Sequence, residues 1–158
     1  MKFFIKFSIY VLLVASVILT IVPAHMFPAF LDVRYMGLAA LVQVGLIYFL
    51  PRFLAVPTDQ PNAEIKNKAV ENFQFLMALT FFINAVGDAG FYQLYKIGFE
   101  FDKFLHFTIP TIATFIFTIF FYYRFEFKRV TALPVTTLIV AVLAIGWEVF
   151  EYTMDYYF

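Results

Sequence analysis

Two short stretches of the sequence hold the residue types that bind metal ions and transfer protons. Asp102 and His106 are four residues apart in FEFDKFLHFTIP, and Glu148 and Glu151 are three apart in GWEVFEYTMD. Residues at these spacings share one face of a helix. Carboxylates and an imidazole on facing helices can hold a divalent cation, act as general acid and base, or relay protons. The spacing alone leaves these three uses open.

Each pair also has a purely structural interpretation. Asp102 near a helix start suits the helix dipole and can form an ion pair with His106 at a membrane interface. Glu148 and Glu151 place two like charges on one helix face, which requires a cation or a proton between them. The two glutamates therefore point to a functional site more strongly than the first pair does.

A further carboxylate, Asp88, lies four residues after Asn84 and between Gly87 and Gly90. Small residues permit close approach of helices in a membrane, so Asp88 could be an interhelical hydrogen-bonding group. Oxygen-rich ligation favours magnesium, calcium or manganese, and one histidine also suits zinc or iron. The candidate catalytic and metal-binding residues are Asp102, His106, Glu148 and Glu151, with Asp88 added for the metal.

Long apolar segments must position these residues. The chain has 158 residues, of which 63% are hydrophobic, 22% aromatic and only 14% charged, a composition typical of an integral membrane protein. A helix needs roughly 20 mostly apolar residues to span a bilayer. Five segments meet this condition, so we predict one all-α domain over residues 1–158, a membrane helical bundle with helices at about 3–27, 35–56, 73–95, 101–123 and 131–158.

Charge and cysteine content exclude several classes of protein. The formal net charge is zero, and we find no stripe of Arg and Lys of the kind that binds nucleic acid. Cysteine is absent, which excludes disulfides, thiolate catalysis and Cys-ligated metal centres. The expected partners are membrane lipid and another membrane protein chain, and no nucleic acid.

The distribution of Lys and Arg predicts the orientation, because these residues are retained on the cytoplasmic side. With the N-terminus inside, eight of them lie in the cytoplasm and three outside. The length of the first segment favours a retained helix over a cleaved signal peptide. We therefore predict a multi-pass protein of the inner (plasma) membrane, N-terminus inside and C-terminus outside. This topology brings the polar residues of the third, fourth and fifth helices to one outer level.

The same polar motifs resemble a known family. The run NAVGDAGFYQLYKIGFEFDKFLHF, followed by GWEVFEYTMD, resembles the YjdF-like family of small bacterial membrane proteins and, more distantly, the VanZ-like family. The resemblance covers about the last half of the chain. It implies a D-K-x-x-H-F motif that opens one helix and a W-E-x-x-E motif in the next, mapped here onto Asp102, His106, Glu148 and Glu151, with Trp147 as the flanking aromatic residue. YjdF-like chains continue past the second motif through a polar segment that has no counterpart here.

Two functions are consistent with this sequence. In the first, the outward-facing Asp/His/Glu site holds a divalent cation or shares protons while it binds or acts on an envelope lipid head group. In the second, the protein is a non-enzymatic membrane subunit or scaffold, and the carboxylates close the bundle or seat a protein partner. Ion transport is less favoured, because the first two helices supply no buried charge to continue a path.

Overall fold

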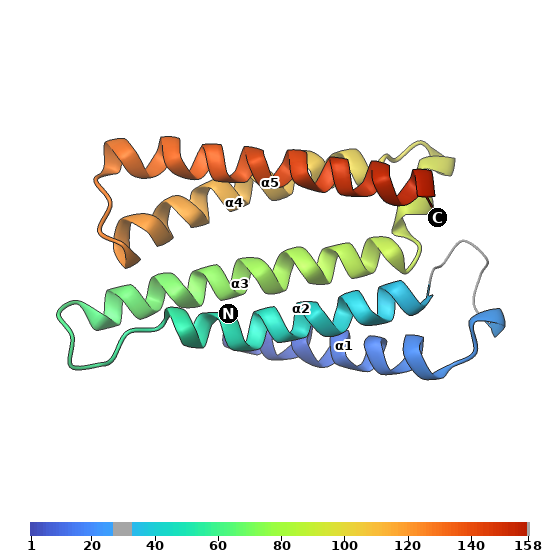
Figure 1. The fold of residues 1–158 in the computed structure, drawn as a ribbon, viewed down its shortest axis with the longest axis horizontal. Helices are drawn as coiled ribbons and strands as arrows, with labels where there is room; N and C mark the ends of the chain where they lie inside the picture. The colour runs from blue at the N-terminus through green and yellow to red at the C-terminus, as the bar shows by residue number, and fades with distance from the viewer. Residues whose placement is uncertain (27–32, 158) are drawn as a thin grey trace.

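The fold consists of five long α-helices (Figure 1). The computed structural model describes residues 1–26 and 33–157, and this part contains no strand. All five helices are long and apolar enough to cross a membrane, so the chain is an all-α, multi-pass membrane protein, as the sequence predicts. The elements are α1 (Lys2–Ile21), η1 (Ala24–Met26), α2 (Val33–Leu54), α3 (Ala63–Asp88), η2 (Phe91–Ile97), α4 (Phe101–Arg124) and α5 (Arg129–Tyr157).

The predicted bounds of the third helix are wrong at both ends. We expected residues 73–95, but α3 begins at Ala63, ends at Asp88 and is followed by the separate 3₁₀ segment η2. The polar residues before 73 are compatible with a helix that projects from the lipid, and a hydropathy rule does not detect them. At the other end, Gly90 has a φ of 131°, a conformation open mainly to glycine, which ends the helix.

The first helix also ends earlier than predicted. We expected it to reach residue 27, but α1 ends at Ile21 and Val22 is extended, because the residue before a proline is disfavoured in the helical conformation and Pro23 follows. Residue 27 lies outside the described part of the chain. The other three helices agree with the prediction to within two residues at each described end.

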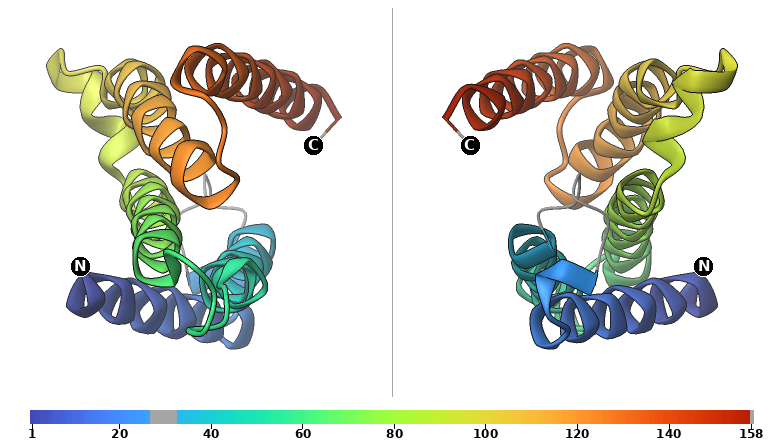
Figure 2. Two further views of the ribbon diagram at one scale, coloured as in Figure 1. Left: turned by 90° about the vertical axis from the view of Figure 1, so that its left-hand side faces the viewer. Right: turned by 90° about the vertical axis from the view of Figure 1, so that its right-hand side faces the viewer.

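The helices are packed in sequence order. In the end-on views of Figure 2, α1 crosses obliquely beneath the bundle, and α4 and α5 lie on the side of α3 away from α1. α1 packs along α2, α3 packs against α1, α2 and α4, and α5 packs along α4. Fully buried Leu12 and Ile47 join the first two helices to α3, while Leu76, Ala113 and Val140 join α3, α4 and α5. Many large apolar side chains remain exposed on the outer faces, where lipid would cover them.

The two ends of the bundle carry different charges. We call the end formed by the α2–α3 and α4–α5 connections the basic end, and the opposite end, formed by η2, the start of α4 and the last turns of α5, the histidine end (Figure 1). The basic end contains eight of the eleven Lys and Arg residues of the chain: Lys2, Lys6, Arg52, Lys66, Lys68, Arg124, Lys128 and Arg129. The cytoplasmic location of this end, which the retention of Lys and Arg on that side predicts, stays a prediction.

Polar side chains at the basic end hold the end of α2. Asn67 Nδ2 donates to Val56 O at 3.0 Å, and Val56 N donates to Asn67 Oδ1 at 2.9 Å. Arg124 Nε donates to Leu54 O at 2.6 Å. The last carbonyls of a helix lack intrahelical partners, so these contacts from α3 and α4 satisfy backbone groups at the α2 C-terminus.

An ion pair joins the first turn of α3 to the turn between α4 and α5. Lys66 Nζ lies 2.6 Å from Glu126 Oε1, which links α3 to the turn between α4 and α5. The hydrogen bond from Lys66 and its positive charge lower the pKa of Glu126 below the ordinary value of 4.5. The pair thus favours the ionised carboxylate at this end.

Candidate functional site

Side-chain contacts join α4 and α5 at two levels, one between Thr118 and Thr136 and the other between His106 and Glu148. Thr118 Oγ1 and Thr136 Oγ1 are 2.7 Å apart, and Thr136 is fully buried. His106 is twelve residues before Thr118 on α4, and Glu148 is twelve residues after Thr136 on antiparallel α5. Twelve helical residues correspond to about 18 Å of rise. The threonine contact therefore sets the register that places His106 opposite Glu148.

His106 contacts one carboxylate from each helix. Its Nδ1 lies 2.7 Å from Glu148 Oε1, and its Nε2 lies 3.2 Å from Asp102 Oδ1. An ionised carboxylate only accepts hydrogen bonds, and a neutral imidazole has one donor and one acceptor nitrogen. With these distances, each ring nitrogen of His106 has a carboxylate oxygen as its partner.

The three side chains are open to the surroundings. The exposed fractions are 36% for His106, 57% for Asp102 and 60% for Glu148. The shorter contact joins the ring to the other helix, whereas the longer contact lies within α4. The imidazole therefore lies closer to Glu148 of the neighbouring helix than to Asp102 of its own helix.

Three of the five predicted site residues contact one another in the structure. Asp102, His106 and Glu148 form the contacts above. Glu151 follows Glu148 by one turn on α5, and Asp88 is the last residue of α3; their side chains lie outside the described part of the structure. This grouping supports the predicted convergence of the fourth and fifth helices.

Asn84, which the sequence places on the same face as Asp88, has another role. It accepts a hydrogen bond from the hydroxyl of Tyr92 at 3.0 Å. A Cβ atom on Gly87 would lie only 2.5 Å from the Tyr92 ring, so the glycine allows this ring to pack on α3. The Tyr92 ring also packs edge-on against Phe101, with centroids 5.7 Å apart. These contacts brace η2 against the start of α4, immediately before Asp102.

The observed geometry does not provide an open histidine ligand for a metal. Among the described residues, no group of three or more His, Asp or Glu side chains is arranged to hold a metal ion. Both ring nitrogens of His106 face carboxylate oxygens, so neither lone pair is free while these contacts persist. A metal at this site would have to replace the contact with Asp102, while Glu148 could still orient the ring, as carboxylates do for metal-binding histidines. The predicted metal stays a prediction.

Sequence reasoning missed the contact that aligns the two helices. Thr118 and Thr136 occur among many apolar residues, and nothing in their spacing predicts that they face each other. It also used Lys2, Lys6 and Arg52 only to orient the chain, although all three line one cavity at the basic end. The spacing of Lys2 and Lys6, four residues apart, was the available signal for a shared face.

Comparison with models of protein families, with curated proteins and with solved structures gives no match for this chain. The resemblance to the YjdF-like and VanZ-like families rests on the motifs at 102–107 and 147–151 and stays a prediction. The arrangement of Asp102, His106 and Glu148 is consequently the main basis on which a function can be proposed.

Proposed function

We propose that this protein of the inner (plasma) membrane binds an envelope lipid head group at the Asp102–His106–Glu148 site and donates a proton to it. The observation that carries the proposal is the pair of contacts made by one imidazole, 2.7 Å to Glu148 and 3.2 Å to Asp102. An imidazole held by a carboxylate on one nitrogen and able to exchange a proton on the other is suited to general acid–base catalysis.

Each residue has a distinct part in this proposal. Glu148 accepts from Nδ1, so it fixes the ring orientation and the position of one proton. Asp102 shares the second proton with Nε2. When a leaving-group oxygen of the head group replaces Asp102 as the partner of Nε2, it accepts this proton as its bond to phosphorus breaks. Water is the co-reactant: its hydroxyl forms the new bond to phosphorus and its proton restores the ring.

The position and composition of the site favour a head group as the partner. Asp102 and His106 lie in the first two turns of a helix that is long enough to span the membrane, which is the level of lipid polar groups. Two carboxylates beside one imidazole favour a head group that carries an ammonium group over one with only a phosphate. The exposed sides of Asp102 and Glu148 give such a group direct access.

The decisive experiment compares the two histidines of the chain. The purified protein is reconstituted with phosphatidylethanolamine, and the lipids are followed by mass spectrometry in wild type, His106→Asn and His25→Asn. General acid–base catalysis contributes roughly 10²- to 10⁴-fold, so we expect product formation to fall by at least about 100-fold in His106→Asn. His25→Asn should match the wild type, because His25 lies in η1, away from the site residues in the sequence.

Two results would overturn the proposal. Product formation in His106→Asn at the wild-type rate would exclude proton donation by this ring, and the absence of any product from the wild type would exclude the proposed chemistry for this head group. Elemental analysis of the same preparations, with a Glu148→Ala, Glu151→Ala double variant, tests the divalent metal. Stoichiometric metal that vanishes in the double variant would replace proton donation with metal-assisted chemistry.

A non-enzymatic membrane subunit is the second candidate, and a pattern on α5 favours it. Exposed apolar residues recur at alternating spacings of four and three along this helix: Leu138, Val142, Ile145, Val149 and Tyr152. This heptad spacing is typical of a helix that packs against another helix. The test is whether a second chain co-purifies stoichiometrically with the protein. Loss of that chain in Val142→Trp, together with its retention in the exposed α2 variant Leu41→Trp, would favour this function.

A further inference from the structure

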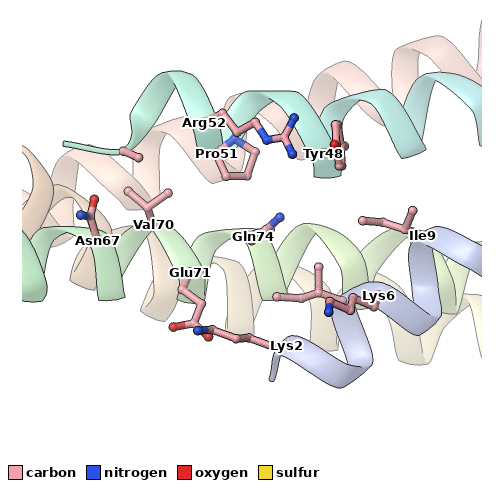
Figure 3. A pocket seen from close by; sticks show the side chains of 12 residues that line it. Lys2, Lys6, Ile9, Tyr48, Pro51, Arg52, Asn67, Val70, Glu71 and Gln74 are labelled. Carbon is pink, nitrogen blue, oxygen red and sulfur yellow. The ribbon is translucent and has the colours of Figure 1, made fainter. Parts of the chain in front are cut away.

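A cavity at the basic end is distinct from the histidine site. It has a volume of about 420 Å³ and lies between α1, α2 and α3. In Figure 3, Arg52 extends from α2 on one side, Lys2 and Lys6 extend from α1 on the other, and Glu71 and Gln74 of α3 lie between them. The lining thus contains three cationic side chains and one carboxylate.

The carboxylate of this cavity is engaged elsewhere. Glu71 Oε2 lies 3.1 Å from Lys68 Nζ, and Lys68 does not line the cavity. Within residues 1–26 and 33–157, none of the three lining cations forms an ion pair with a carboxylate. The cavity therefore has an excess of positive charge.

The amides that line the cavity fix its walls. Asn67 forms the two hydrogen bonds with Val56 described above, and Gln74 Nε2 donates to Ile47 O at 2.9 Å. These bonds tie α3 to α2 along one side of the cavity. The charged groups of the other two helices are then left to meet a ligand.

Arg52 is held in place before any ligand arrives. Its guanidinium carbon lies 3.6 Å from the centre of the Tyr48 ring, one turn earlier on α2. A guanidinium stacked on an aromatic face retains its N–H edge for hydrogen bonds, and this edge matches two oxygens of a phosphate. Lys2 and Lys6 add two mobile donors from the opposite wall.

We propose that this cavity binds the phosphate of an anionic phospholipid head group. Lys2 and Lys6 open the first membrane helix and Arg52 lies in the last turn of the second, so the cations stand at the level of the lipid phosphates. Apolar Ile5, Ile9 and Val70 also line the cavity and suit the glycerol and upper acyl carbons. Basic pockets between membrane helices on the cytoplasmic side recognise anionic head groups in this way.

The test uses two pairs of substitutions with equal loss of charge. Lys6→Gln, Arg52→Gln removes two cavity cations, and Lys128→Gln, Arg129→Gln removes two cations from the basic end outside the cavity. Both arginines lie over a tyrosine ring, Arg52 over Tyr48 and Arg129 over Tyr122. Binding of phosphatidylglycerol, phosphatidylcholine and inorganic phosphate to the purified protein is measured by native mass spectrometry and by thermal shift.

We expect the wild type to bind phosphatidylglycerol at least tenfold more tightly than phosphatidylcholine. The affinity for phosphatidylglycerol should fall at least tenfold in Lys6→Gln, Arg52→Gln (the cavity pair) and should stay within twofold of the wild type in Lys128→Gln, Arg129→Gln (the control pair). Equal losses of affinity in both pairs would show that the lipid is attracted to the charge of the whole basic end, and would overturn the proposal. Unchanged binding in the cavity pair would also overturn it. Inorganic phosphate that binds as tightly as the lipid would identify a free-anion site instead. The single variant Lys6→Gln, at an exposed position, repeats the test if the double variant unfolds.

Discussion

The basic end and the histidine end use polar side chains in opposite ways. At the basic end, Arg124 bonds to the backbone of the last residue of α2, and Asn67 bonds to the backbone of Val56 in the connection that follows. At the histidine end, Asp102, His106 and Glu148 bond to one another and keep a large part of their surface exposed. Polar groups that satisfy backbone atoms stabilise the fold, whereas exposed groups that satisfy one another remain available to a ligand.

The largest effect on stability should come from Asn67→Ala at the basic end. The substitution leaves the N–H and C=O of Val56 without their side-chain partner. Loss of hydrogen bonds to such partly buried groups costs about 1–3 kcal/mol. Thermal or denaturant unfolding in detergent should show this loss.

Asn72→Ala is the matched control for that change. Asn72 lies on the same helix, and no hydrogen bond of its side chain occurs within the described residues. Its free energy of unfolding should stay within about 0.5 kcal/mol of the wild type. If the two variants are equally stable, Asn67 does not hold the end of α2.

An intermediate effect on stability is expected for Thr118 and Thr136, which lie between the two ends and set the α4–α5 register. In a cycle of Thr118→Val, Thr136→Val and the double variant, we expect a coupling energy of about 0.6–1.7 kcal/mol, as for hydrogen bonds between membrane helices. A coupling energy near zero in unfolding measurements would show that the 2.7 Å contact does not align the helices.

Glu148→Gln should have a smaller effect on stability. The side chain is 60% exposed, and exposed ion pairs contribute about 0–1 kcal/mol. Under the proposed function, product formation should nevertheless fall sharply, because an amide orients the ring less strongly than a carboxylate. A stability loss as large as that of Asn67→Ala would remove the distinction between the two ends.

The smallest expected effect on stability is that of the Lys66–Glu126 ion pair, and it depends on pH. The pKa of Glu126 is lower in the folded protein than its ordinary value of 4.5. The pair therefore contributes stability above about pH 4.5 and loses it as the pH falls through the lowered pKa. In unfolding measurements from pH 7 to pH 3, Glu126→Gln should be slightly less stable than the wild type at neutral pH and should approach it in acid. Parallel curves for the two proteins would contradict this assignment.

The sequence predicts most of the membrane helices because their length is set by the bilayer. It fails at α3, where residues 63–72 include several charged and amide side chains and are nevertheless helical. Gln74 bonds to the backbone of α2, and Asn67 bonds to the backbone of Val56, just after α2. These are tertiary contacts that hydropathy cannot detect. The predicted third helix also runs into the 3₁₀ segment η2, because this segment is apolar. Its residues contact α3 and α4 and do not continue the membrane-spanning helix.

The candidate site was predictable in part. The spacing of Asp102 and His106 indicates a contact within one helix, and the topology predicts that Glu148 lies at the same level. The order of contacts, with the imidazole between the two carboxylates, depends on the α4–α5 register set by Thr118 and Thr136. Periodicity within one helix carries no information about that register, so the geometry required the structure.

The close approach of the Tyr92 ring to Gly87 has a consequence for evolution. Because a Cβ atom at residue 87 would lie 2.5 Å from that ring, the two positions should change together among related sequences. An alanine at 87 would require either a shift of the Tyr92 ring or a smaller residue at 92, and either change would disturb the hydrogen bond to Asn84. Residues 84, 87 and 92 should therefore vary together, independently of the residues of the histidine site.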